Sequence, residues 1–254
     1  MLLAVDIGNT TTVVGFYNGP KLEYRYSIRS DYGHSLEEIS SSFSLFLKDK
    51  GIERKSFEGA IISCVVPSLE TWWKALLKDE YGLRPYVVGP KLKTGLIIKT
   101  DNPKEVGSDL IADAVAAKSL YGENVLIADL GTANKVILIG KDGAFEGCTI
   151  GIGMGLSARA LSLDAALLPS VSMEIPNRVL GKNTPDSMNS ALTYGVSYEI
   201  RGLCDAIEKE AGVPCKRIMT GGYARFLKDL LNDFEYVDEL TLLGLRLIYE
   251  RNRK

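Results

Sequence analysis

Short apolar runs alternate with amphipathic stretches along the chain, and these two periodicities predict its elements. An apolar, β-rich run opens the sequence at residues 2–7, and Asn18-Gly19 then gives a two-residue hairpin signal. Further on, Ser35 and Glu38 form a capping-box pattern, after which apolar residues recur at helical spacing. Helices are predicted over residues 35–47, 68–77, 108–120, 155–168, 187–211, 223–232 and 239–251. Strand groups followed by alternating helix and strand predict an α/β fold with mixed sheets.

One segment of this pattern occurs twice. Residues 2–19 read LLAVDIGNTTTVVGFYNG and residues 125–143 read VLIADLGTANKVILIGKDG. Each copy has an apolar strand, an Asp-X-Gly turn, a second β-rich strand and a hairpin signal. A shift of 123 residues aligns three pairs: Asp6 with Asp129, Gly8 with Gly131, and Val13 with Val136. The shared turn at the same strand end favours duplication over a chance likeness of two buried strands.

A second, weaker internal repeat pairs residues 60–77 with 217–231. Each of these segments reads as an apolar strand, a short turn and an amphipathic helix. Two internal repeats in the same order along the chain indicate that one architecture occurs twice. We therefore expect an N-terminal domain over 1–118 and a C-terminal domain over 119–254. The last helix, 239–251, is expected to pack back on the first domain.

Composition and charge exclude several classes of partner. Apolar residues make up 46% and charged residues 24%, which is typical of a soluble globular protein. Thirty Lys and Arg against thirty-two Asp and Glu give a net charge of −2, so no long-range field attracts nucleic acid or an anionic membrane. The apolar runs are strand-sized and the start lacks a basic region, which argues against a transmembrane helix and a signal peptide.

The cysteines and the single histidine limit the chemistry further. Cys64, Cys148, Cys204 and Cys215 form no CxxC pair, a pattern that indicates buried, reduced thiols and a cytoplasmic protein. His34 is expected to be an exposed loop residue. With only one histidine, a histidine-based zinc site and any catalytic triad that does not use His34 are excluded.

The two Asp-X-Gly turns carry the candidate chemistry. An aspartate at the carboxyl end of a strand, followed by glycine, lies beside a tight turn whose amides point outward. Backbone N–H groups and hydroxyls bind phosphate oxygens, while the aspartate can hold Mg²⁺ through water. The hydroxyl residues that follow are Thr10, Thr11 and Thr12 in the first copy and Thr132 in the second. Two such turns could close on the phosphates of one nucleotide from opposite sides.

A third element is Gly221-Gly222 after the strand-like RIMT. The absent side chains would let a flat base or ribose lie against the backbone. One Asp-X-Gly is also an ordinary turn, but two in duplicated frames with a strand-terminal Gly-Gly favour an actin-like, sugar-kinase-like fold. In that fold duplicated ribonuclease H-like domains have a nucleotide cleft between them.

Over nearly its whole length the chain resembles the type III pantothenate kinases. The opening motif is Asp6-Ile7-Gly8-Asn9-Thr10, the middle motif Asn102–Asp109, and the second phosphate motif Asp129-Leu130-Gly131-Thr132-Ala133. Further matches are Gly181-Lys182-Asn183-Thr184, Ser187-Met188-Asn189-Ser190, Thr220-Gly221-Gly222, Leu240-Thr241-Leu242 and Gly244-Leu245. The resemblance implies ATP-dependent phosphorylation of the primary hydroxyl of pantothenate, the entry step to coenzyme A.

The resemblance also implies residue roles. Asp6 and Asp129 would organise the phosphate and Mg²⁺ site, and the nucleotide would contact Gly8, Asn9, Thr10, Thr11, Gly131, Thr132, Gly221 and Gly222. Asp109 would be the catalytic base, with Gly107 and Ser108 beside the acceptor. A monovalent cation, K⁺ or NH₄⁺, is implied as a second ion. Family members are homodimers in which the threonine matching Thr184 reaches the neighbour's acceptor pocket.

Two interpretations of Asp109 remain open. Phosphoryl transfer has a loose transition state, so a carboxylate that orients the acceptor hydroxyl and takes its proton is what the chemistry needs. A strongly helical run follows Asp109, so the residue can also serve as a helix N-cap. Both can hold, because a residue at a helix start can project into a cleft.

Several positions depart from the family pattern, chiefly on the acceptor side. Leu110 stands where the family has an arginine that binds the acceptor's carboxylate. The other departures are Thr100 for an aromatic residue, Cys148 for a glycine, Ile152 for a proline, Asn134-Lys135 for a threonine pair, and Ala191 for a glycine. A charged hydrogen bond contributes about 1.5–3 kcal/mol, so losing the arginine could weaken an anionic acceptor about ten- to a hundredfold.

Three functions are compatible with these departures. The chain can be a pantothenate kinase with a rearranged pocket, a kinase for another small hydroxylated acceptor, or an inactive nucleotide-binding regulatory homologue. Retention of Asp6, Asp109 and Asp129 weighs against the third. Lys135 could replace the missing cation, or be a solvated strand lysine. We expect a homodimer formed through helix 187–211, with contacts from Met188, Ala191, Leu192, Gly195 and Val196.

Overall fold

A computed structural model describes residues 1–30 and 35–253 of the chain. His34, predicted to be an exposed loop residue, lies outside the described residues. The described chain divides into two compact units. The first comprises residues 1–96, 101–116 and 240–254, and the second comprises 97–100 and 117–239.

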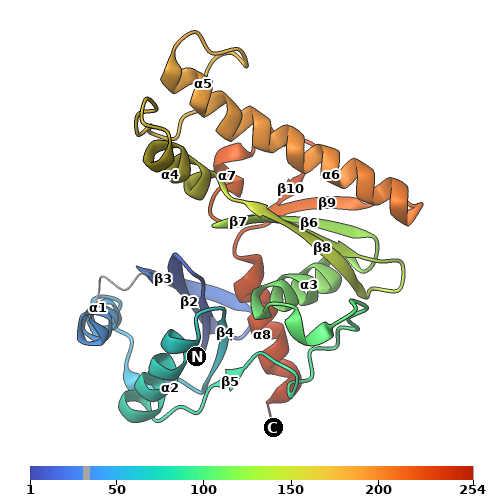
Figure 1. The fold of residues 1–254 in the computed structure, drawn as a ribbon. Coiled ribbons are helices and arrows are strands. Elements are labelled where there is room, and N and C mark those ends of the chain that lie inside the picture. Colours follow the sequence, from blue (N-terminus) through green and yellow to red (C-terminus); the bar gives the residue numbers. More distant parts are fainter. Residues whose placement is uncertain (31–34, 254) are drawn as a thin grey trace. The chain divides into compact units, whose positions relative to one another are not determined.

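The first unit is built on a five-stranded mixed sheet of order β3-β2-β1-β4-β5 (Figure 1). Strand β1 pairs antiparallel with β2 and parallel with β4. The strands are β1 (Leu2–Ile7), β2 (Thr11–Asn18), β3 (Lys21–Arg29), β4 (Gly59–Cys64) and β5 (Tyr86–Val87). The helical segments are α1 (Leu36–Asp49), η1 (Arg54–Ser56), α2 (Pro67–Tyr81), η2 (Pro103–Glu105), the first part of α3 (Ser108–Tyr121) and α8 (Leu240–Asn252).

Alternation along β1 divides its side chains between two faces. Leu3, Val5 and Ile7 belong to a core that also holds residues of α1 and α2. Leu2, Ala4 and Asp6 therefore point to the opposite face. Helix α8 covers that face: Gly15, the cross-strand partner of Ala4, lies so close to Leu242 that a Cβ would be 2.9 Å from it.

The second unit repeats the plan. Its five-stranded sheet has the order β10-β9-β6-β7-β8, with β6 antiparallel to β7 and parallel to β9. The strands are β6 (Val125–Leu130), β7 (Ala133–Ile139), β8 (Phe145–Ile152), β9 (Lys216–Thr220) and β10 (Glu235–Tyr236). The helices are α4 (Met154–Asp164), α5 (Thr184–Ser190), the π-helical turn η3 (Ala191–Gly195), α6 (Val196–Ala211) and α7 (Ala224–Leu227). The shared topology confirms the predicted duplicated α/β fold.

The two copies differ by one residue at their first turn. Asp6 pairs with Val13 in the first sheet, whereas Asp129 pairs with Lys135 in the second. A constant shift of 123 residues would have placed Val136 opposite Asp129, so the sequence alignment fails just beyond the second turn. Because the second turn is one residue shorter, every side chain of β7 lies on the opposite face of the sheet from the face that this alignment predicts.

Several helices differ from their predicted extents. The capping box of α1, with Ser35 and Glu38, is present as predicted. Helix α4 ends at Asp164 rather than at 168, and its C-cap residue Ala165 already has an extended backbone (φ −114°, ψ 99°). The segment predicted as helix 223–232 forms only the single turn α7. None of the helices in the described ranges has the length and apolar character needed to cross a membrane.

The predicted burial of the cysteines is wrong at one position. All four thiols are free, and Cys204 is buried while Cys64 and Cys215 are half-buried. Cys148, however, is exposed on β8, an edge strand of its sheet. Burial raises the pKa of the Cys204 thiol to about 12, so this side chain behaves as a small apolar core group.

Candidate functional site

The first Asp-X-Gly turn joins β1 to β2 and leaves its central residues accessible. The Gly8 amide donates to the Thr11 carbonyl at 3.1 Å, which closes the turn, while Asn9 and Thr10 are exposed. The backbone carbonyl of Thr10 accepts from the Ser30 amide at 2.9 Å, which ties the turn to the end of β3. The turn therefore presents exposed polar groups from a fixed backbone, as a phosphate-binding turn requires.

Thr12 does not belong to that exposed set. Its side chain is buried, and its hydroxyl lies 2.8 Å from the hydroxyl of Ser30. Alternation along β2 explains the difference, because Thr11 and Val13 point to the opposite face from Thr12. Of the three consecutive threonines, only Thr10 and Thr11 remain candidates for phosphate contact.

Asp109 is held at the carboxyl end of β4 by its neighbour Ser108. The Ser108 hydroxyl accepts from the Cys64 amide at 2.8 Å and lies 3.0 Å from the hydroxyl of Ser63. Ser63 is the register partner of Asp6 on the adjacent parallel strand. The start of α3 is therefore fixed beside the end of β1, and the first unit brings the Asp6 strand end and Asp109 to the same sheet edge.

The helix start also bears on the two interpretations of Asp109. Helix α3 begins at Ser108, so Asp109 lies within its first turn rather than at the N-cap. The Ile111 amide bonds the Gly107 carbonyl at 3.1 Å, which marks Gly107 as the residue that precedes the helix. A Cβ on Gly107 would overlap the Asp109 carboxylate. Glycine at 107 thus leaves room for this side chain.

Leu110, at the family's arginine position, is 5% exposed. It is apolar and buried within the first unit, so it offers no donor to an acceptor's carboxylate. Among the acceptor-side departures in the second unit, Ile152 is 52% exposed and Cys148 is also exposed. At these positions apolar residues therefore replace residues that are polar or turn-forming in the family. The replacement at 110 lies in the core, and those at 148 and 152 lie on the surface.

In the second unit, Asp129 lies at the end of β6 beside the turn of Gly131 and Thr132. Leu126, Ala128 and Leu130 enter the core under α6, so Asp129 points to the other face of the sheet. Its carboxylate oxygen Oδ2 is 2.6 Å from the ammonium nitrogen of Lys135, its cross-strand partner. Both side chains are mostly buried, at 14% and 16% exposed.

The Gly-Gly turn after β9 meets the same aspartate. Gly221 has φ +93°, a conformation that favours glycine, and a Cβ there would be 2.5 Å from an Asp129 carboxylate oxygen. The Tyr223 amide donates to the Leu130 carbonyl at 2.9 Å. Gly222, by contrast, has open space where a Cβ would be. The structure therefore brings together two predicted elements, the second Asp-X-Gly turn and Gly221-Gly222.

The start of α4 also belongs to this cluster. It was not among the site elements that were predicted from the sequence. The Gly153 amide donates to the Thr132 carbonyl at 3.0 Å, and a Cβ on Gly153 would overlap the Gly131 carbonyl oxygen. A Cβ on Gly155 would likewise overlap the Tyr223 hydroxyl. The Gly153-Met154-Gly155 spacing was the sequence signal, since two glycines at a helix start permit such close approach.

Thr184 lies at the first position of α5 and is exposed. The Asn183 side chain caps the helix, accepting from the Asp186 amide at 2.8 Å. This exposure suits a residue that contacts another molecule. Thr184 is separate in the sequence from both turns, and its role rests on the family resemblance.

The residues present fit a magnesium ion carried by a nucleotide. Within the described ranges no group of three His, Cys, Asp or Glu side chains could hold a metal ion by itself. Mg²⁺ usually keeps several waters and binds through one or two carboxylates together with substrate phosphates. Each turn on its own offers a single carboxylate, Asp6 in the first unit and Asp129 in the second, which is compatible with this mode and not with a closed metal centre.

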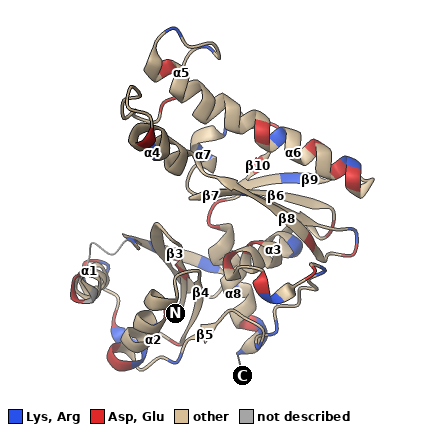
Figure 2. Cartoon of the chain, viewed as in Figure 1, with Lys and Arg blue, Asp and Glu red and all other residues tan. Residues whose placement is uncertain are grey.

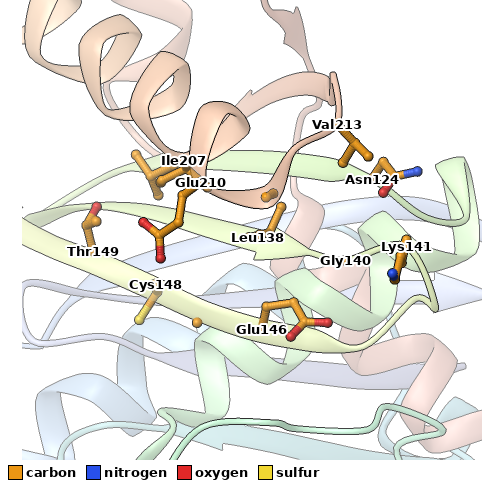
Figure 3. A pocket seen from close by; sticks show the side chains of 13 residues that line it. Asn124, Leu138, Gly140, Lys141, Glu146, Cys148, Thr149, Ile207, Glu210 and Val213 are labelled. Atoms are coloured by element: carbon orange, nitrogen blue, oxygen red, sulfur yellow. The ribbon is translucent and has the colours of Figure 1, made fainter.

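A cavity of about 530 Å³ lies elsewhere in the second unit (Figure 3). Leu138, Ile207 and Val213 provide apolar walls, and Glu210 and Cys148 are among the polar groups that line it. It is near the end of β7 and the start of β8, whereas the phosphate turn precedes β7. The cavity is lined by Cys148, one of the departures from the family pattern, but by none of the residues predicted to bind nucleotide or acceptor.

Acidic and basic residues are interspersed over the helices (Figure 2). In the second unit Arg217 is 2.6 Å from both Asp205 and Glu208, and Arg201 is 2.6 Å from Asp233. The Arg217 guanidinium holds the pKa of the Glu208 carboxyl below its ordinary value. Basic side chains here are largely matched by acidic ones, as the small net charge predicts.

Known proteins resemble this chain both in sequence and in structure. The family described as type III pantothenate kinase matches residues 2–206. A type III pantothenate kinase from Geobacillus sp. (strain WCH70) is 36% identical over 99% of this chain and 98% of its own. One from Listeria monocytogenes serotype 4a is 35% identical over 100% and 98%. The solved structure of component A of (R)-2-hydroxyglutaryl-CoA dehydratase from Acidaminococcus fermentans has a TM-score of 0.57 and 15% identity, covering 99% of each chain, and shows the shared fold alone.

Proposed function

Since this chain belongs to the type III pantothenate kinase family, we propose that it transfers the terminal phosphoryl group of ATP to the primary hydroxyl of pantothenate. This reaction would be the first step of coenzyme A biosynthesis. The observation that carries the proposal is the anchoring of Asp109. Two hydrogen-bonded serines, Ser63 and Ser108, hold it at the strand edge where Asp6 and the first phosphate turn lie.

On the nucleotide side, we assign phosphate contacts to the Asp-X-Gly turn of each unit. In the first unit the phosphate contacts come from Gly8, Asn9, Thr10 and Thr11. In the second unit they come from Gly131 and Thr132, with Gly221 and Gly222 against the adenosine. The carboxylates of Asp6 and Asp129 are the residues that would hold Mg²⁺, which when bound would supply positive charge to the phosphates. A monovalent cation, K⁺ or NH₄⁺, is a second proposed requirement, on the basis of the family resemblance.

On the acceptor side, Asp109 orients the hydroxyl and accepts its proton as the oxygen attacks phosphorus. Gly107 and Ser108 define the wall beside it. The dominant contributions to phosphoryl transfer are positioning and charge stabilisation, so the main role of the Asp109 carboxylate is to orient the acceptor hydroxyl.

Leu110 favours one second candidate, a kinase for a small hydroxylated acceptor other than pantothenate. The buried leucine supplies no charge to an acceptor carboxylate, so an acceptor without that group would bind this pocket with less loss. Phosphoryl transfer itself would use the same residues. The two candidates differ only in the acceptor that stimulates turnover.

The experiment that separates them measures ADP release by the purified full-length chain with ATP, Mg²⁺ and K⁺, with and without pantothenate. We expect pantothenate-stimulated ADP release with one phosphate incorporated per ADP formed. Stimulation only by a different hydroxylated compound would establish the second candidate. ATP binding without turnover on any acceptor would overturn both and leave a nucleotide-binding regulatory protein.

We also propose a homodimer, but its surface differs from the predicted helix contacts. Of the five predicted contact residues, Met188, Leu192 and Val196 are at most 7% exposed and are not free for a partner, whereas Ala191 and Gly195 are exposed and remain available. The exposed large apolar side chains of the second unit include Ile150, Ile152, Leu161, Leu163, Leu167, Val179, Leu180 and Tyr198. Exposed apolar residues in this number on neighbouring elements are typical of an interaction surface.

Charge substitution in this surface tests the dimer. Leu163 and Leu167 are 74% and 94% exposed, so the double replacement Leu163→Glu/Leu167→Glu changes no internal contact of consequence. We expect a dimer for the unchanged chain and a folded monomer for the variant, measured by light scattering at micromolar concentration. Leu45→Glu in the first unit, at a position 68% exposed, is the matched control and should remain dimeric. A monomeric unchanged chain would refute the dimer and a role of Thr184 in a neighbour's pocket.

A further inference from the structure

A hollow lies between the end of α6 and strands β7 and β8 (Figure 3). This is the cavity of about 530 Å³, a volume within the range of pockets that hold small organic molecules. Ile207 and Ala211 of α6 and Val136 and Leu138 of β7 form its walls. All of its lining residues fall within 117–239, so the hollow belongs to the second unit alone.

Small residues on both sides explain why the core does not fill this hollow. Leu138 packs against the core that α6 covers, and Gly147 is its cross-strand partner on β8. Cross-strand partners share a face of the sheet, so position 147 lies on the face below α6. A Cβ at Gly147 would meet nothing within 4 Å. On the helix side, Ala211 is the last residue of α6 and carries only a methyl group.

The polar side chains of the hollow are mainly hydrogen-bond acceptors. The side-chain oxygen of Asn124 is buried, and no donor among the described residues reaches it. Two of the charged lining residues are acids, Glu146 and Glu210, and the third is Lys141. The Lys99 ammonium nitrogen is 2.8 Å from Glu146, whereas the described part of the chain places no cation within ion-pair distance of Glu210. A ligand that enters the hollow therefore meets an unpaired carboxylate and an oxygen that lacks a donor.

We propose that the hollow is a binding site for a small amphipathic amine, with its apolar body between α6 and β7 and its ammonium group paired with Glu210. The apolar body would remove surface of Leu138, Ile207 and Val213 from water. The ammonium would form a charge-assisted hydrogen bond with the Glu210 carboxylate, and a further donor on the ligand would satisfy Asn124. This site is additional to those for nucleotide and acceptor, and it does not rest on the proposed function.

Lys141 offers the opposite possibility, an anionic ligand. Its side chain is exposed at the hairpin between β7 and β8. A bound carboxylate would bring another acceptor to Asn124, which needs a donor, and would add negative charge beside Glu146 and Glu210. The lining therefore favours a cation, and the test includes an anion of the same shape.

Three probes with one apolar body separate these ligands. Tryptamine carries an ammonium group, tryptophol a hydroxyl group and indole-3-propionate a carboxylate on the same indole. Their affinities for the purified full-length chain are measured by calorimetry. We expect one tryptamine per chain, with an affinity at least tenfold above those of tryptophol and indole-3-propionate, because one charged hydrogen bond is worth about ten- to a hundredfold.

Removal of the charge tests the role of Glu210. Glu210→Gln changes an exposed position, so the fold should be unaffected. We expect it to lower tryptamine affinity at least tenfold and to leave tryptophol affinity within about twofold. Glu123→Gln replaces an exposed acid of the same unit that does not line the hollow, and this matched control should bind as the unchanged chain does.

Filling the hollow should abolish binding of all three probes. Gly147→Phe places an aromatic ring in open space, and aromatic residues favour strands where glycine weakens them, so the melting temperature should not fall. Ala211→Phe fills the same hollow from α6 and serves as a second variant if the first disturbs β8. Thermal unfolding in parallel shows whether each variant is folded.

The contrary outcomes concern the site and its ligand separately. Failure of tryptamine to saturate the unchanged chain, or unchanged binding in folded variants of both filling positions, would overturn the site. Equal affinities for the three probes, tighter binding of indole-3-propionate, or full tryptamine affinity in Glu210→Gln would overturn the assignment of a cation to Glu210.

Discussion

Replacing Asp109 by asparagine is expected to lower kcat for pantothenate phosphorylation by about 10²–10⁴-fold, the usual contribution of a positioned general base. Asparagine keeps the size of the side chain but cannot accept the proton of the acceptor hydroxyl. ATP affinity should change little, because the nucleotide contacts are assigned to other residues. Steady-state kinetics with ADP detection, together with calorimetric ATP binding, measure both quantities.

The helix-start interpretation of Asp109 makes a different prediction. A carboxylate in the first turn of α3 interacts with the helix dipole and contributes about 0.3–1 kcal/mol. A residue acting only in this way would cost a few degrees of melting temperature and leave kcat unchanged. Asp101→Asn, an exposed position shortly before η2, is the control and should behave as the unchanged chain. More than a tenth of the original kcat in Asp109→Asn would contradict the catalytic role.

Gly244→Ala is expected to destabilise the protein by about 3 kcal/mol or more, a severe case of overpacking. Gly244 is buried in α8, and a Cβ there would be 2.5 Å from the carbonyl carbon of Ala112 in α3 and closer still to its oxygen. Both helices belong to the first unit. Because the obstacle is backbone, no rotamer change can relieve it. Denaturant unfolding at equilibrium gives the free energy directly.

Gly202→Ala is the matched control and should change stability in the opposite direction. Gly202 lies in α6, is exposed, and has open space where a Cβ would be. Glycine inside a helix costs about 0.5–1 kcal/mol relative to alanine, so this replacement should stabilise by that amount. A stabilising or neutral Gly244→Ala would show that α3 and α8 do not pack as closely as the structure has them. Thr241, whose hydroxyl donates to Asp113 at 2.7 Å, would then also be misplaced.

The sequence pattern predicted the topology because each Asp-X-Gly copy carries its own strand periodicity and turn chemistry. It did not predict the approach of Gly221 to Asp129, which follows in the structure because the parallel strands β6 and β9 end at one sheet edge. It missed the pairing of Lys135 with Asp129. The two turns differ in length by one residue, which leaves the Asp-X-Gly motifs aligned in the sequence but moves the side chains of the following strand to the opposite face of the sheet. Turn length is decided by backbone hydrogen bonds, here the Gly131 amide to the Ala133 carbonyl.

The helix through residues 187–211 shows a second limit of pattern reasoning. Its apolar positions were predicted to face another copy of the chain, but Leu192 and Val196 pack within their own unit. Apolar periodicity identifies a buried face and does not identify what buries it. The side chains that are left for a partner, such as Leu163 and Leu167, belong to α4 and the segment after it.

The assignment of α8 to the first unit has a consequence for biosynthesis. Strands β1 to β4 emerge from the ribosome early, but one face of their sheet is covered by residues 240–252, which emerge last. The first unit cannot close its interior during translation, whereas the second, almost continuous in sequence, can form as it is made. We therefore expect nascent chains arrested before residue 240 to protect the second sheet from protease and leave the first sheet open to cleavage.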